Sequence, residues 1–198
     1  MCATVIREDP FKGSTGIMGH HSPFLSHNQL NYSFEYWLGV GVHHFQNPQN
    51  QDLKASLVTS NFLLKRWNGK ALQSNLYALI GGGISTLDGV NQKSTGAVGL
   101  QYDIEDRRYY FLAKHMQLLT KETSAFKQSV VRAGIAPYEG DFDDLHSWFI
   151  LEYSRNEWGQ GFVMEDTTPF LRFFYKNLLF ELGQSFRGIT RFNYIIHF

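Results

Sequence analysis

The chain has 198 residues with 18 basic and 18 acidic side chains, so its formal net charge is zero. That balance argues against bulk electrostatic binding of nucleic acid, which needs an excess of Lys and Arg. Aromatic residues make up 16% of the chain and charged residues only 18%, below the roughly 25% of an ordinary soluble domain. Yet no run of about 18 uninterrupted apolar residues exists, which excludes a transmembrane helix. A transmembrane β-barrel fits both observations, because its apolar residues occupy every second position.

Alternation of apolar and polar residues runs through most of the chain, and turn residues separate the runs. The clearest run, Gln29–His43, keeps one apolar and one polar face over more residues than a strand of a soluble sandwich usually has. Asn68-Gly69 is a strong hairpin signal, because a type I′ turn needs positive φ at both central residues. In chain order, ten strands are expected: Gln29–His43, Lys54–Trp67, Lys70–Gly82, Thr95–Ile104, Arg108–Leu119, Lys127–Ala136, Leu145–Arg155, Pro169–Tyr175, Leu178–Leu182 and Ile189–Phe198.

The connections between these runs alternate, for most of the chain, between longer polar loops and tight turns. Outer-membrane barrels have this layout, with the short turns at the periplasm. The expected fold class is therefore all-β, a transmembrane antiparallel up-and-down β-barrel of about ten strands, with eight or twelve as alternatives. Residues 1–28 are expected to form a periplasmic lead-in segment and residues 29–198 the barrel. An even number of strands places both chain ends on the periplasmic side.

The end of the sequence carries a resemblance to bacterial outer-membrane β-barrel proteins. Phe192, Tyr194 and Ile196 alternate along the last run and Phe198 closes it, as in the C-terminal signature of that class. The resemblance implies that these four residues are an assembly signal read by the barrel-assembly machinery. It also implies the outer membrane of a Gram-negative bacterium, with its lipid and lipopolysaccharide as partners. The terminal Phe and the even strand count favour this location over the outer membrane of an organelle.

Charged residues stand opposite the apolar faces of the predicted strands. A charge that faces lipid costs roughly 2–4 kcal/mol at the bilayer midplane, so these side chains are assigned to the lumen. A barrel of about eight strands has an interior just filled by side chains, and ten strands leave slightly more room. Charges of both signs would fill such a lumen more readily than line a wide pore, with a narrow conduit or ligand cavity as the alternative. The predicted lumen-lining charges are Glu35, Lys114, Arg132, Glu152, Arg172, Glu181 and Arg191.

Three histidines before the first predicted strand suggest metal binding. His20, His21 and His27 could hold Cu or Zn, for which imidazole is a ligand. Met18, Gly19 and His21 also resemble a Met-Gly-x-His element of some outer-membrane barrels, a few of them associated with heavy-metal or aromatic-compound pathways. The alternative interpretation of these histidines is a polar lead-in that binds no metal.

The opposite end of the first predicted strand carries His43 and His44. They are expected near the outer rim, separated by the bilayer from the first three histidines and therefore part of no common site. A histidine beside a carboxylate is what general-base chemistry requires, although no spacing here fixes such a pair. The rim candidates are His43, His44, Glu122, Glu157, Glu165 and Asp166.

The expected function is that of an integral outer-membrane barrel with a structural, binding or narrow-transport role and a lumen mostly filled by mixed charges. Two alternatives keep the barrel in the membrane: a hydrolase, either a protease or a lipid-modifying enzyme, with its active site at the rim, and a metal-handling barrel that uses the N-terminal histidines. A soluble lipid-binding barrel with an apolar interior is the third. No catalytic residue is assigned, and nucleic acid is not an expected partner.

Overall fold

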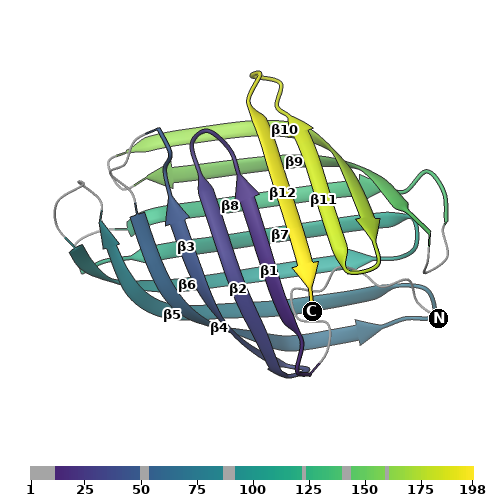
Figure 1. Cartoon of the computed structure of the whole chain (residues 1–198), viewed down its shortest axis with the longest axis horizontal. Coiled ribbons are helices and arrows are strands. Elements are labelled where there is room, and N and C mark those ends of the chain that lie inside the picture. The colour runs from purple at the N-terminus through teal and green to yellow at the C-terminus, as the bar shows by residue number, and fades with distance from the viewer. Residues whose placement is uncertain (1–11, 50–53, 87–91, 122–123, 140–143, 159–160) are drawn as a thin grey trace.

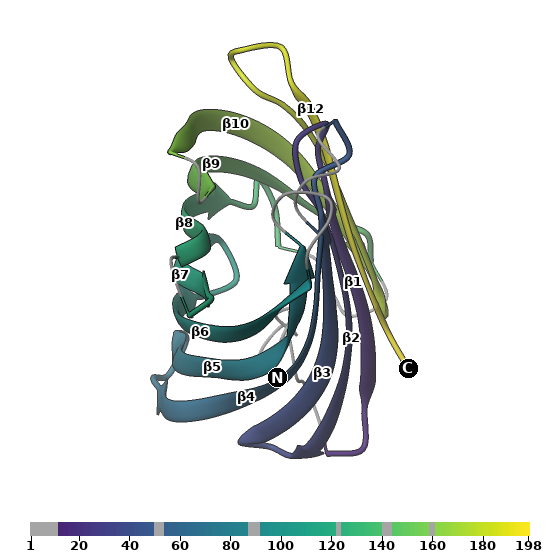
Figure 2. The same ribbon diagram turned by 90° about the vertical axis from the view of Figure 1, so that its left-hand side faces the viewer.

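The computed structural model describes residues 12–49, 54–86, 92–121, 124–139, 144–158 and 161–198. Neighbouring strands in the chain pair antiparallel, and β1 pairs with β12, so the sheet closes into a barrel (Figures 1 and 2). No helix in this part of the chain is long and apolar enough to cross a membrane. The twelve strands are β1 (Thr15–His21), β2 (Ser26–Glu35), β3 (Leu38–Gln46), β4 (Lys54–Asn68), β5 (Gln73–Thr86), β6 (Gln92–Glu105), β7 (Tyr109–Leu119), β8 (Ser124–Ile135), β9 (His146–Trp158), β10 (Phe162–Tyr175), β11 (Leu178–Gln184) and β12 (Thr190–His197).

The barrel closes where its first and last strands meet. The Thr15 amide donates to the Phe198 carbonyl at 3.2 Å, and the Phe198 amide donates back to the Thr15 carbonyl at 2.9 Å. The end of the barrel that holds this pair is called the terminal end. The opposite end, where residues 22–25 connect β1 to β2, is called the far end. Figure 2 shows the closed wall, with β1–β3 and β12 facing β6–β10.

Twelve strands replace the expected ten, and both additional strands come from the N-terminal part of the chain. The expected strand Gln29–His43 is in fact two strands, because the chain reverses at Tyr36 and Trp37 between β2 and β3. Strand β1 precedes them and pairs with β2 and β12. The expected lead-in segment over residues 1–28 is therefore wrong from Thr15 onward. Residues 156–168, expected as a loop, instead extend β9 to Trp158 and begin β10 at Phe162.

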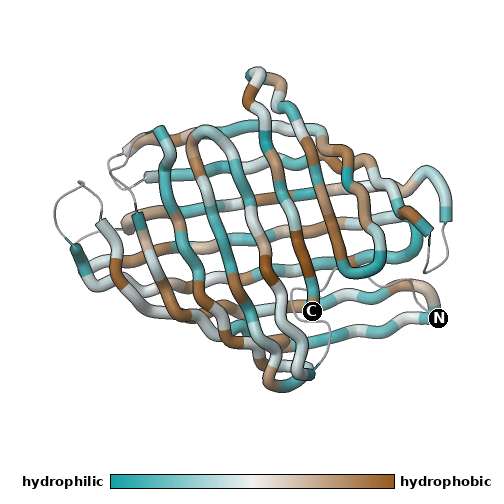
Figure 3. The backbone as a smooth tube through the Cα atoms, viewed as in Figure 1, coloured by the Kyte–Doolittle hydropathy of each residue, from teal (hydrophilic) through white to brown (hydrophobic). Residues whose placement is uncertain are grey.

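Side chains alternate between the outer face and the lumen, because successive residues of a strand point to opposite sides of the sheet. On β9, Phe149 and Leu151 are about half exposed on the outside, at 55% and 50%, while Ile150 and Glu152 are buried inside. The same alternation appears as successive brown and teal segments along the strands in Figure 3. Apolar outside and polar inside is the arrangement of a transmembrane barrel and the reverse of a soluble one.

The outer face changes character along the barrel. At the far end it becomes charged: Arg155 Nη1 donates to Glu165 Oε1 at 2.6 Å, and Lys127 Nζ lies 3.8 Å from Glu157 Oε2. At the terminal end the strands carry exposed aromatic rings of the kind that sit at a membrane interface, and charged pairs such as Arg108–Glu139 lie in the connections beyond them. Those rings include Tyr32, Trp67, Tyr109 and Tyr175, whereas Tyr153 lies beside the charged part of β9.

Two glycines on β5 let this strand lie close against β4. A Cβ atom on Gly83 would lie 2.0 Å from the Ser56 carbonyl oxygen, and one on Gly81 would lie 2.7 Å from that of Val58. Both distances are shorter than any real Cβ contact, so only glycine fits at these positions.

Candidate functional site

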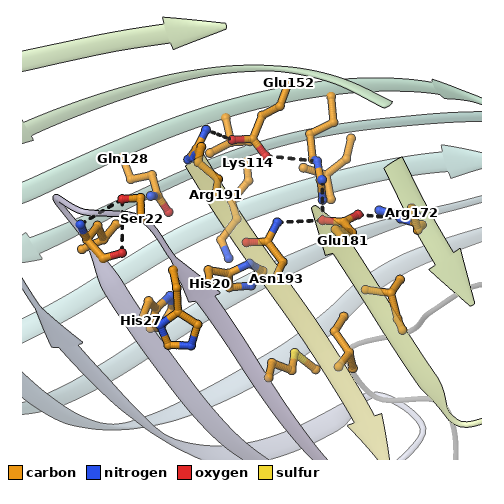
Figure 4. A pocket seen from close by; sticks show the side chains of 18 of the residues that line it. His20, Ser22, His27, Lys114, Gln128, Glu152, Arg172, Glu181, Arg191 and Asn193 are labelled. Carbon is orange, nitrogen blue, oxygen red and sulfur yellow. Dashed lines mark hydrogen bonds and ion pairs between the residues drawn. The ribbon is translucent and has the colours of Figure 1, made fainter. Parts of the chain in front are cut away.

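A network of ion pairs crosses the lumen. Arg132 on β8 donates from Nη2 to Glu181 Oε2 on β11 at 2.7 Å, and Arg172 Nε on β10 donates to Glu181 Oε1 at 2.6 Å. Glu152 on β9 accepts from Arg191 Nη1 on β12 at 2.7 Å and lies 3.2 Å from Arg132 Nε. Two of these pairs, Arg132–Glu181 and Arg191–Glu152, join strands that are not neighbours, so they connect opposite parts of the wall across the lumen. The five residues are called the ionic layer, and Figure 4 labels four of them, Glu152, Arg172, Glu181 and Arg191.

Three members of the ionic layer, Glu181, Arg172 and Arg132, have further contacts with the barrel wall. Glu181, with its side chain 1% exposed, also accepts a bond of 2.7 Å from Asn193 Nδ2. The guanidinium of Arg172 lies 4.6 Å from the Tyr110 ring centre, and that of Arg132 lies 5.3 Å from the Phe170 ring centre. Buried carboxylates and guanidinium groups are stable only when paired and hydrogen-bonded in this way.

The far end of the lumen is filled by apolar side chains. Phe45 on β3 and Phe126 on β8 have no exposed surface, and their ring centres lie 6.2 Å apart across the lumen. Trp158 packs against Phe126, with ring centres 5.6 Å apart. Leu25 closes the group from the β1–β2 connection. This apolar layer consists of Leu25, Phe45, Ala55, Leu57, Ala97, Met116, Leu118, Ala125 and Phe126.

Beside the ionic layer lies a cavity of about 120 Å³. Four basic side chains and two acidic ones line it, and the acidic pair is Glu152 and Glu181. Histidines from β1 and β2, including His20 and His27, line its opposite side (Figure 4). The cavity is smaller than the roughly 300–1,000 Å³ of a drug-sized ligand site.

The structure brings six of the seven predicted lumen charges to this cavity. They are Lys114 and the five residues of the ionic layer. Glu35 is the exception: it lies at the terminal end of β2, after an irregularity in register at Ser33, and pairs with Lys12 at 2.5 Å. Its side chain is 42% exposed at this end, so it does not reach the cavity that the other six line. The strand pattern could not show this, because alternation gives the side of the wall to which a residue belongs and not its depth along the barrel.

The structure does not gather the three histidines that were predicted to bind metal. His20 and His27 face the lumen, whereas His21 faces outward and stacks against Tyr194, because consecutive residues of a strand point to opposite faces. Among the described residues, no group of three His, Cys, Asp or Glu side chains is placed to hold a metal ion.

His27 and His43 were expected on opposite sides of the bilayer, but the structure brings them into contact. His27 Nε2 and His43 Nδ1 share a hydrogen bond of 3.2 Å. The His27 ring also stacks on Phe45, with ring centres 3.8 Å apart. The turn at Tyr36 and Trp37 is what brings His43 back beside His27.

The rim residues weighed for hydrolysis are also dispersed. His43 is buried in the lumen, His44 faces outward and shares a 3.0 Å hydrogen bond with Ser56, and Glu165 is paired with Arg155. Asp166 is buried on the lumenal side of β10, and Glu122 lies outside the described residues. The structure therefore does not join a rim histidine to these carboxylates.

The four residues of the expected assembly signal belong to the last strand and the residue that follows it. Tyr194 and Phe192 stack with the outward-facing His21, and Phe198 is 72% exposed at the terminal end. Ile196 lies opposite Ile17 of β1. Their recognition by an assembly machinery stays a prediction.

No protein-family model matches this chain, and no curated protein matches it. Among solved structures, it is similar to the KdgM porin in complex with disordered oligogalacturonate, with a TM-score of 0.52 and 12% sequence identity over 93% of this chain and 98% of that chain. A second KdgM porin structure gives a TM-score of 0.50 and 13% identity over the same shares. Identities this low establish the fold alone, which is that of a porin-like outer-membrane β-barrel.

Proposed function

We propose that this protein is an integral barrel of the Gram-negative outer membrane whose lumen is held closed by its own side chains. Its role is the binding or narrow transport of small solutes, and it does not act as an open diffusion pore. The observation that carries this proposal is the pair of layers that span the lumen. The ionic layer joins Arg132 to Glu181, and the apolar layer joins Phe45 to Phe126, each across strands that are not neighbours.

The outer face supports the membrane location and favours one orientation of the barrel. The charged pairs at the far end, such as Arg155 with Glu165, would lie where strands extend beyond the bilayer into lipopolysaccharide. The aromatic rings at the terminal end would lie at the periplasmic interface. Both chain ends are then periplasmic, and Phe198 would be available to the assembly machinery before closure.

Conductance across a planar lipid bilayer tests the closed lumen. The refolded wild-type protein should give little or no stepwise current, because side chains occupy the cross-section. A Phe45→Ala/Phe126→Ala variant should give clear steps, while Phe149→Ala, which removes an outward-facing ring, should behave as wild type. Steady wild-type current as large as that of the double variant would overturn the proposal.

A further inference from the structure

A serine, a histidine and a glutamine form a connected group on the outer face of β7 and β8. His115 Nδ1 and Ser129 Oγ lie 2.8 Å apart, and His115 Nε2 lies 2.8 Å from the carboxamide nitrogen of Gln117. Because Met116 between them is buried in the lumen, His115 and Gln117 point outward, and Ser129 is directly opposite His115 in register. A hydroxyl beside an imidazole that a third group orients is the arrangement that activates a serine nucleophile.

Two further His–Ser pairs lie on the outer face, and they show what distinguishes this one. His44 Nδ1 lies 3.0 Å from Ser56 Oγ, and His21 Nδ1 lies 2.9 Å from Ser26 Oγ. Over the residues that the structure describes, neither of these rings has a second side-chain hydrogen bond. Of the three, His115 alone is held at both ring nitrogens, which orients its ring toward the hydroxyl.

The group lies at the border between the apolar band and the charged part of the outer face. Toward the terminal end, the next outward residue after Ser129 is Val131, which is 43% exposed. Toward the far end, the next outward residue is Lys127, and Arg155 lies directly opposite Ser129 on β9. In a bilayer this border is the interfacial region, where ester bonds join the acyl chains of lipids to their head groups.

Arg155 brings a positive charge to the position opposite Ser129. Its Nε donates to Glu157 and its Nη1 to Glu165, and its Nη2 N–H groups are further donors. When a serine attacks an ester, negative charge develops on the former carbonyl oxygen, and a donor already in place stabilises that charge.

We propose that Ser129 and His115 hydrolyse acyl esters of membrane lipids at this border, with Gln117 as a positioning residue. A half-turn of the Gln117 carboxamide brings its oxygen against His115 Nε2. The Nε2 N–H then donates to that oxygen, and Nδ1 accepts from the Ser129 hydroxyl. The inference rests on the membrane location in the proposed function and goes beyond it, because the reaction takes place on the outer face and not in the lumen.

The reaction has two steps, and His115 moves the proton in both. Ser129 Oγ bonds to the ester carbonyl carbon while its proton passes to His115 Nδ1. The ester C–O bond then breaks, and Nδ1 returns the proton to the leaving alkoxide oxygen, which releases an alcohol and leaves an acyl group on Ser129. Water attacks this acyl group in the same way, with its proton passing through His115 to Ser129 Oγ, and releases the fatty acid.

Hydrolysis of p-nitrophenyl octanoate by the refolded full-length protein in detergent micelles tests this inference. The wild type should release nitrophenolate, and Ser129→Ala should lower kcat/KM at least about 100-fold. The matched control is Ser56→Ala, which removes the hydroxyl of the His44 pair on the same outer face and should leave the rate unchanged. Wild-type hydrolysis no faster than that of Ser129→Ala would overturn the proposal.

A second measurement needs no variant at Ser129. A fluorophosphonate reacts with activated serine hydroxyls, so it should label Ser129 of the wild type, as mass spectrometry of the peptides would show. Labelling of Ser56 to the same extent, or none at Ser129, would contradict an activated nucleophile. Because hydrolysis reports on the outer face and conductance reports on the lumen, this inference and the closed lumen of the proposed function can each fail separately.

Gln117 has its own test, since a positioning residue should change how the rate depends on pH. In Gln117→Glu, a carboxylate beside Nε2 stabilises the protonated imidazole of His115, so the acidic limb of the kcat/KM profile should move to higher pH. Gln117→Leu should lower kcat while heat-modifiable gel mobility stays that of the wild type. A pH profile that does not move in Gln117→Glu would contradict the role of Gln117.

Discussion

Arg132 Nη2 lies 2.7 Å from Glu181 Oε2, and this bond joins β8 to β11 across the lumen. In the barrel wall, β9 and β10 lie between these two strands. Both side chains are almost fully buried, at 9% and 1% exposure. Glu181 therefore holds two arginines in place, because Arg172 donates to its other oxygen. Removing this one carboxylate would leave two guanidinium groups without their principal partner.

Substitution of Glu181 should strongly destabilise the barrel. Breaking a buried ion pair by removing one partner costs about 3–5 kcal/mol, because the remaining charge is uncompensated. We expect Glu181→Gln to lower the free energy of unfolding by about this amount in urea titrations followed by heat-modifiable gel mobility. The matched control is Glu165→Gln, whose exposed pair with Arg155 is screened by solvent and should contribute little to stability. Equal losses in the two variants would contradict a buried network.

The barrel class and the sides of most strands could be predicted, because the period-two pattern follows directly from strand geometry. The turn at Tyr36 and Trp37 could not. It has no Gly, Pro, Asn or Asp, and odd-numbered residues face the lumen on both sides of it, as Asn31 and Gly41 do. The alternation therefore continues through the turn without a break, and one strand was expected where there are two.

The site was predictable only as a set of inward-facing charges. Arg132 pairs with Glu181, and Arg191 with Glu152, across strands that are not neighbours, and the alternation along one strand carries no information about contacts across a lumen. The ends of β9 and β10 were missed for a different reason. Their outward residues, such as Arg155 and Glu165, are polar beyond the apolar band, so the hydrophobic signal stops before the strands do.

The His27–His43 pair gives a direct test of the β2–β3 hairpin. His27→Leu should destabilise the protein by about 1–3 kcal/mol, because it leaves His43 Nδ1 buried without its partner. The double variant His27→Leu/His43→Leu should lose less than the sum of the single losses, since replacing both partners removes the unsatisfied group. Urea unfolding of the four proteins in a double-mutant cycle measures this coupling. Coupling near zero would contradict the pair and the hairpin that forms it.

Gly83 should tolerate no side chain. Its Cβ would lie 2.0 Å from the Ser56 carbonyl oxygen, so Gly83→Ala forces β4 and β5 apart and should cost about 1–3 kcal/mol or more. Gly82→Ala is the control, because the nearest atom to a Cβ there is the Thr95 carbonyl oxygen at 3.9 Å, an ordinary contact. Refolding yield into micelles and unfolding in urea should separate the two variants. A Gly82→Ala loss as large as that of Gly83→Ala would contradict this packing.

The proposed orientation predicts which connections are reached from outside the cell. In a Cys2→Ser background, Gln49→Cys lies in the β3–β4 connection at the far end, and Lys70→Cys lies in the β4–β5 connection at the terminal end. A membrane-impermeant maleimide added to intact cells should label Gln49→Cys and leave Lys70→Cys unlabelled until the outer membrane is permeabilised. Labelling of Lys70→Cys alone in intact cells would reverse the orientation.

The change from apolar to charged residues on the outer face predicts where the hydrocarbon region of the bilayer ends. Leu151 faces outward within the apolar band, so Leu151→Arg should reduce stability in lipid vesicles by about 2–4 kcal/mol, because a charge facing lipid near the midplane is costly. Thr167 lies further toward the far end on β10, paired with Tyr153 and close to the charged residues, and Thr167→Arg should cost only about 0–1 kcal/mol. The two variants add the same side chain to adjacent strands, so strand propensity and net charge largely cancel in the comparison. Equal stabilities would mean that Leu151 does not face lipid, and a soluble barrel would then have to account for its half-exposed apolar surface.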